Sequence, residues 1–136
     1  MTRDTPHSHY CALDCPDPLA LADFYAALVS GKVEDLGDFP RDHVTWLEIM
    51  TPWGAVIGFQ KVPDYRAPTW PDGPVPQQAH LDFLVDDLPS ALERAERLGA
   101  RRAEVQPGET FVVLLDPVGH PFCLVHDPRE GLSAVG

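Results

Sequence analysis

The stretch HLDFLVDDLPSALERAERLG, residues 80–99, decides the fold because a second stretch of the chain repeats its pattern. It begins as a short run in which apolar and polar residues alternate, as they do in a half-buried strand. Asp87 then precedes a run with leucines at helical spacing, and Gly99 follows that run. An aspartate caps the start of a helix and a glycine ends one. The stretch therefore predicts a strand followed by a helix.

The stretch YCALDCPDPLALADFYAALVSG, residues 10–31, has the same features in the same order. Asp17 is its predicted cap, and Pro18 suits the first helical turn. Gly31 is the predicted stop. Asp17 and Asp87 lie 70 positions apart, just over half of the 136-residue chain. A period of half the chain indicates an internal duplication.

Two extended segments follow each predicted helix, and a Pro-x-Gly sequence typical of a tight turn joins each pair. They are residues 44–50 and 55–62 in the first half, and residues 110–116 and 121–127 in the second. Residues 32–34 and 100–104 can each add one more strand. The predicted order is therefore βαβββ, twice, which is an α+β fold of two tandem modules.

A proline-rich connection, residues 63–77, separates the two modules. Its proline content favours an extended, stiff chain. We expect one domain over residues 1–136, with module one at about 8–62 and module two at about 78–127. Trp70, inside the connection, is expected to be anchored on the body of the protein; the alternative is a lid over a ligand.

Composition and charge exclude several classes of protein. The net charge of −11 opposes nucleic-acid binding, which needs basic side chains, but it tolerates a cationic ligand. No apolar run reaches the ~18 residues of a membrane helix, and the first residues lack the apolar segment of a secretory signal. The three cysteines lack disulfide or paired zinc-site spacing. We expect a cytoplasmic protein with reduced thiols and no membrane partner.

Two βαβββ modules of this size resemble the vicinal oxygen chelate superfamily, which includes glyoxalase I, bleomycin-resistance proteins and extradiol dioxygenases. The chain is similar in particular to small glyoxalase-like domain proteins, over roughly residues 8–127. The phrases that carry the resemblance are LDCPDPLALADFYAALVSG, HLDFLVDDLPSALERAERLGA and DPVGHPFCLV. The resemblance implies a cup-shaped, largely antiparallel sheet with helices on the outside. It also implies a homodimer.

The resemblance also implies where a metal would be held. In metal-dependent members of the superfamily, histidine, glutamate or glutamine ligands come from the first and last strands of each module. The matching positions here are Tyr10, Gln60 (or Gly58), His80 and Cys123. This set has too few good donors for a hard-metal site. We therefore expect no cofactor; a divalent metal, if present, would use His80, Gln60 and Cys123.

Strand alternation places further side chains toward the cup. Aromatic walls with a few convergent polar groups suit a small organic ligand. The predicted ligand-binding residues are Tyr10, Trp46, Glu48, Gln60, His80, Asp82 and Cys123. The alternative is that Trp46 belongs to the core and that Glu48 and Asp82 are solvated at the rim.

Three functions are compatible with these residues. The first, which we expect, is a metal-free protein that binds a small organic ligand, as bleomycin-resistance proteins bind a cationic drug. The second is an enzyme with His80 and either Glu48 or Asp82 as acid and base, or a divalent-metal lyase, isomerase or dioxygenase acting on a vicinal-oxygen substrate. The third is a structural or interaction module whose own side chains fill the cup. The catalytic residues stay open, with His80 and Glu48 as candidates.

Overall fold

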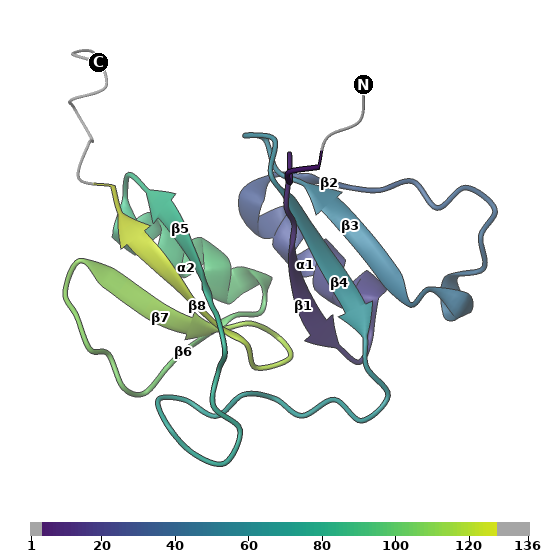
Figure 1. Ribbon diagram of the computed structural model, residues 1–136. Coiled ribbons are helices and arrows are strands. Elements are labelled where there is room, and N and C mark those ends of the chain that lie inside the picture. Colours follow the sequence, from purple (N-terminus) through teal and green to yellow (C-terminus); the bar gives the residue numbers. More distant parts are fainter. Residues whose placement is uncertain (1–3, 128–136) are drawn as a thin grey trace. The chain divides into compact units, whose positions relative to one another are not determined.

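The computed structural model describes residues 4–127, which form two compact units whose boundary in the chain falls between Tyr65 and Arg66. This boundary lies inside the proline-rich connection. Within the described residues, each unit has one four-stranded sheet and one α-helix (Figure 1). The predicted α+β fold of two βαβββ modules is confirmed. Neither of these helices is long and apolar enough to cross a membrane.

Module one has one parallel and two antiparallel strand pairings. The strand order is β1-β4-β3-β2, in which β1 and β4 are parallel and the other neighbours are antiparallel. A short 3-10 turn at Arg41–His43 precedes β3. The elements are β1 (Cys11–Cys15), α1 (Pro18–Val29), β2 (Lys32–Val33), β3 (Trp46–Met50) and β4 (Val56–Lys61).

Module two repeats this topology. Its strand order is β5-β8-β7-β6, with β5 and β8 parallel and the other pairs antiparallel. Each of its strands therefore has an equivalent in module one, as a duplication requires. The elements are β5 (Leu81–Val85), α2 (Leu88–Leu98), β6 (Arg101–Arg102), β7 (Phe111–Leu115) and β8 (Pro121–His126).

The two helices begin at the predicted aspartates. Asp17 Oδ1 accepts a hydrogen bond from Leu19 N at 3.1 Å, and Asp87 Oδ1 accepts one from Ser90 N at 3.2 Å. Each carboxylate satisfies an amide that the first helical turn leaves without a partner.

The helix ends differ from each other. Gly99 adopts a positive φ of 121° at the end of α2, as predicted. In α1 the left-handed residue is Ser30, with φ 56°. Gly31 has another role, because a Cβ there would lie 2.6 Å from the carbonyl oxygen of Met50. Gly31 thus lets the chain pass close to β3.

Each sheet has a face covered by its helix and an opposite face, here called the open face. Figure 1 shows α1 behind β3 and β4, and α2 behind β8. In module one the covered face is apolar: Leu13, Leu47, Ile49 and Phe59 are buried, and Phe59 stacks on Tyr25 of α1 with ring centroids 5.7 Å apart. The predicted alternation of buried and exposed residues is confirmed in β1, β3 and β5.

Register assigns the residues of each open face, because residues paired across a ladder point to the same side. In module one they are Ala12, Asp14, Trp46, Glu48, Met50, Val56, Gly58 and Gln60, with Lys32 at the edge beside Met50. In module two they are Asp82, Leu84, Phe111, Val113, Leu115, Pro121, Cys123 and Val125.

Candidate functional site

The predicted ligand-binding residues divide between the two modules. Tyr10, Trp46, Glu48 and Gln60 belong to module one, and the other three, His80, Asp82 and Cys123, belong to module two. Within its own module, each strand residue of the set lies on the open face. Tyr10 and His80 directly precede β1 and β5 and are exposed. That the two groups line one cavity stays a prediction.

The centre of the module-one site is the Trp46 indole. Its Nε1 donates a hydrogen bond of 2.8 Å to Glu48 Oε2, so two neighbouring open-face residues of β3 hold each other in place. A methyl group at Gly58, on the adjacent strand β4, would overlap the six-membered ring of this indole. Gly58 therefore makes the space that the ring occupies. Trp46 stays 37% exposed, so it is not a core residue.

Two carboxylates, those of Asp14 and Glu48, share the open face of module one with this indole. Asp14, Gln60 and Trp46 occupy one row across β1, β4 and β3. Glu48 lies in the next row. The backbone N–H of Glu48 donates a 2.8 Å hydrogen bond to Glu34 Oε1. In the described part of module one, the open-face positions of β1, β3 and β4 include no lysine or arginine, and the basic residue of that face is Lys32, at its edge on β2. The arrangement favours a positively charged ligand over an anion.

The module-two site brings together three side chains with different donor atoms. His80 Nε2 lies 3.2 Å from Asp82 Oδ1. Cys123 is the register partner of Asp82 on the parallel neighbour β8. One ligating atom from each of His80, Asp82 and Cys123 lies within 4.8 Å of the other two. From the sequence, His80 and Cys123 were expected as ligands, with Gln60, only if a metal is present, and Asp82 was expected in the pocket or as an acid–base partner of His80. The spacing of His80 and Asp82, two positions apart, was the available signal for their contact.

Cys123 is a poor nucleophile in this setting. Burial, together with the negative charge of Asp82 and a hydrogen bond to it, raises the pKa of the thiol to about 11. The thiol is protonated at neutral pH, and the thiolate is the reactive form of cysteine. The site is therefore poorly suited to covalent catalysis through Cys123.

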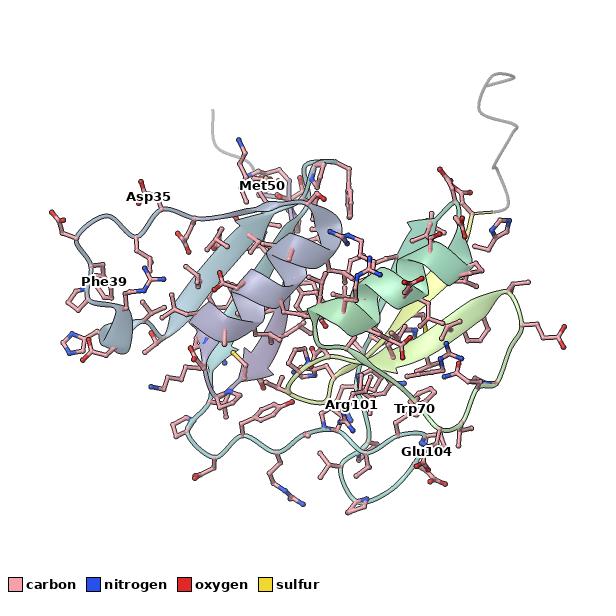
Figure 2. The ribbon with its side chains drawn as sticks, turned by 180° about the vertical axis from the view of Figure 1, so that it is seen from behind. Asp35, Phe39, Met50, Trp70, Arg101 and Glu104 are labelled. Carbon is pink, nitrogen blue, oxygen red and sulfur yellow. The ribbon has the colours of Figure 1, made fainter. Side chains whose placement is uncertain are left out.

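Part of the open face of module two is filled by the chain itself. Ala103, Val113 and Cys123 form a buried cluster, and partly buried apolar side chains, among them Trp70 and Phe111, pack against it. Trp70 Nε1 also donates a 3.4 Å hydrogen bond to the carbonyl of Val105, and Figure 2 shows Trp70 beside the segment that carries Glu104. The expected anchoring of Trp70 is confirmed. The hypothesis of a structural or interaction module predicts that the protein's own side chains fill the open face. In module two they do so next to Cys123.

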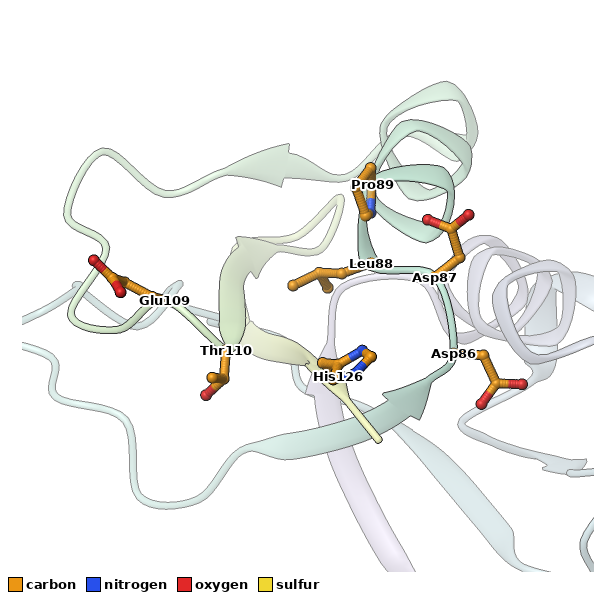
Figure 3. Close-up of a pocket in the computed structure, with 7 residues that line it drawn as sticks. All are labelled: Asp86, Asp87, Leu88, Pro89, Glu109, Thr110 and His126. Atoms are coloured by element: carbon orange, nitrogen blue, oxygen red, sulfur yellow. The ribbon is translucent and has the colours of Figure 1, made fainter. Parts of the chain in front are cut away.

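A hollow of about 430 Å³ lies at the other end of β5, around the start of α2 (Figure 3). None of the predicted site residues lines it; its lining is Asp86, Asp87, Leu88, Pro89, Glu109, Thr110 and His126. Asp86 is four residues beyond Asp82, about 13 Å along a strand. Asp87 is already engaged in capping α2. The hollow is therefore separate from the module-two site.

Comparison with known proteins agrees with this architecture. The family model described as a glyoxalase-like domain matches residues 10–125. No curated protein matches the chain. The identities with the solved structures that resemble it are low, so the likeness shows the fold alone.

In three of these matches the aligned region covers nearly the whole chain of the solved structure. The fosfomycin resistance protein FosX from Mesorhizobium loti superposes with a TM-score of 0.66 at 14% identity, covering 95% of this chain and 98% of that one. FosX from Listeria monocytogenes gives 0.64 at 14% identity, with coverage of 96% and 98%. A glyoxalase/bleomycin resistance protein/dioxygenase family enzyme from Burkholderia phytofirmans gives 0.62 at 17% identity, with coverage of 86% and 95%.

Proposed function

The chain belongs to the glyoxalase-like domain family of the vicinal oxygen chelate superfamily, and on this premise we propose that it binds a small cationic aromatic compound on the open face of module one. The observation that carries the proposal is the Trp46 indole, which occupies the space over Gly58 and is held by Glu48. This binding function uses no metal.

The chemistry of this surface supports a cation. The face of an indole attracts a positive charge through its quadrupole, by about 0.5–2 kcal/mol depending on how far the pair is removed from water. The hydrogen bond from Nε1 to Glu48 fixes the ring and leaves its exposed surface available. Glu48 adds negative charge beside the ring, and Asp14 and Glu34 add negative charge elsewhere in module one. An aromatic ligand adds apolar contact with the ring.

The names of the structural neighbours support ligand binding in general. They include resistance proteins and an enzyme. One fold therefore carries several functions, and the ligand must be inferred from the site. In this chain the exposed tryptophan and the carboxylate of Glu48 bound to it support a cation.

A thermal-shift titration tests the proposal. The phenyltrimethylammonium ion is expected to stabilise the protein by about 2.7 kcal/mol at one hundred times its Kd, and tert-butylbenzene, its neutral isostere, much less. Trp46→Ala is expected to remove most of this gain, and Glu48→Gln part of it, because they remove the ring and a charge. Trp53→Ala is the matched control, since Trp53 is 63% exposed in the turn between β3 and β4. Equal losses at Trp46 and Trp53, or equal binding of the neutral isostere, would contradict the proposal.

A second candidate function is acid–base or metal-assisted chemistry at module two. The observation in its favour is the 3.2 Å contact between His80 Nε2 and Asp82, in which the carboxylate orients the imidazole. A bound metal would polarise neighbouring substrate oxygens. Turnover of a small α-hydroxycarbonyl compound that requires His80 and not Trp46 would favour this candidate over binding alone.

The proposal includes a homodimer, on family resemblance alone. We expect light scattering at micromolar protein concentration to give twice the monomer mass of 15.0 kDa. A mass of one chain at that concentration would refute the dimer and would leave the ligand proposal unaffected.

A further inference from the structure

We propose that residues 67–76 of the proline-rich connection, here called the strap, form a movable lid whose Trp70 side chain shields the open face of module two. The strap and that face belong to the same compact unit. The strap swings away while the module stays folded, and the seat that Trp70 leaves then accepts a neutral planar aromatic compound. This inference goes beyond the cation site of module one and does not depend on it.

The seat of the Trp70 indole is mostly apolar. The indole packs against the buried cluster of Ala103, Val113 and Cys123. Val113 is the register partner of Cys123, and the N–H of Ala103 donates a hydrogen bond to the carbonyl of Val113, so the cluster is one row across the sheet. Asp82 ends this row on the far side of Cys123. Trp70 therefore shields part of the face on which the Cys123 thiol lies.

The strap is held together by hydrogen bonds within itself. The N–H of Thr69 donates a 2.6 Å hydrogen bond to the carbonyl of Val75. Thr69 Oγ1 donates to the same carbonyl at 3.0 Å and accepts from the N–H of Val75 at 3.3 Å. Figure 1 shows the strap turning back on itself before the chain enters β5. Because these bonds can stay intact when the strap moves, it can leave the module as a unit.

The contacts that join the strap to the module are weaker. Trp70 Nε1 reaches the carbonyl of Val105 at 3.4 Å, beyond the ~3.2 Å upper end of the usual range for such a bond. The indole is only partly buried. At the start of the strap, Ala67 lies against Gly119, where an added Cβ would be 2.8 Å from the Cβ of Ala67. Breaking these contacts costs less than breaking the sheet, so the strap is expected to open locally before the module unfolds.

The duplication indicates which ligand the opened face would take. Phe111 holds the register position of Trp46, and Val113 holds that of Glu48. The carboxylate that favours a cation in module one is thus replaced by an aliphatic side chain. Trp70 itself shows that a neutral indole, with one N–H donor, fits the seat. The ligand class is therefore a neutral planar aromatic compound of indole size.

Alkylation by iodoacetamide, followed by peptide mass spectrometry, tests whether the strap opens by itself. Opening of the strap exposes little surface, so the rate at Cys123 is expected to change less than about twofold between 0 and 1 M urea. Cys15 is the control, because it is fully buried on the covered face of module one and is reached only by unfolding. Its rate is expected to rise at least about fivefold. An equally steep rise at Cys123 would refute a separately opening strap.

Variants of the strap test whether Trp70 is the shield. Trp70→Ala is expected to raise the rate at Cys123 at least about tenfold, because it uncovers the thiol and relieves the burial that helps to raise its pKa to about 11. Thr69→Val, which loosens the strap and keeps the indole, is expected to raise it about threefold. Trp53→Ala, which removes an exposed indole from module one, is the matched control and should leave the rate unchanged.

An unchanged rate at Cys123 in Trp70→Ala would overturn the proposal, and so would an equal increase in Trp53→Ala. The rate at Cys15 should be the same in all three variants, since none of them unfolds module one. If circular dichroism shows that Trp70→Ala does not fold, Thr69→Val decides, and an unchanged rate at Cys123 in that variant would overturn the proposal.

Indole tests the ligand class. At millimolar concentration it is expected to return the rate at Cys123 in Trp70→Ala to within about threefold of the unmodified protein, because it refills the seat. The phenyltrimethylammonium ion should give no protection. In the unmodified protein indole should protect little further, since the tethered ring competes at an effective concentration in the millimolar range. Absence of protection by indole, or equal protection by the cation, would refute a neutral aromatic site.

Discussion

Replacement of Phe59 by alanine is expected to lower the free energy of unfolding by about 3–5 kcal/mol, the range for a buried phenylalanine. Phe59 is fully buried and stacks on Tyr25 of α1. It lies on β4, which pairs with β1 on one side and β3 on the other. Its removal leaves a cavity where the helix and three strands meet. Urea denaturation followed by fluorescence and circular dichroism measures the loss.

Phe39→Ala is the matched control for this change. Phe39 is exposed in the segment between β2 and β3, so its truncation is expected to cost less than about 0.5 kcal/mol. Similar losses for the two variants would mean that the core of module one is not centred on Phe59. A loss below about 1 kcal/mol at Phe59 would lead to the same conclusion.

The fold could be predicted from the sequence because its signals are local and occur twice. Asp17 and Asp87 each stand before an apolar helical stripe, and each accepts the predicted type of capping hydrogen bond. Alternation in the strands is also local, since it follows from the two-residue period of a strand. A duplicated pattern fixes topology more strongly than either copy alone, because each copy independently gives the same order of elements.

The site was less predictable because it depends on register and on side-chain direction. The sequence placed Trp46, Glu48 and Gly58 on neighbouring strands, but it could not show that the indole occupies the space over the glycine and bonds to the carboxylate. Asp82 was predicted to line a pocket and not to act as a donor. Its convergence with Cys123 depends on a pairing between strands about 40 residues apart, which propensity does not specify.

Replacement of Gly58 by alanine is expected to displace the Trp46 indole and to weaken phenyltrimethylammonium binding at least tenfold, with little cost to folding. The new methyl group would overlap the ring of an exposed side chain that can turn away. The backbone of β4 can accept alanine, because Gly58 does not have a positive φ. The loss of the hydrogen bond to Glu48 follows from the same displacement. Fluorescence emission and isothermal titration with the cation measure the two effects.

A double-mutant cycle with Trp46→Ala separates this explanation from general damage to the sheet. If the methyl group acts by displacing the ring, Gly58→Ala is expected to have almost no further effect on cation binding once Trp46 is alanine. Urea denaturation should place both Gly58 variants within about 1 kcal/mol of their parents, since an exposed ring can move at low cost. Additive losses of binding in the double variant would show that Gly58 acts independently of Trp46. The contact between the ring and the glycine would then no longer explain how module one presents its aromatic surface.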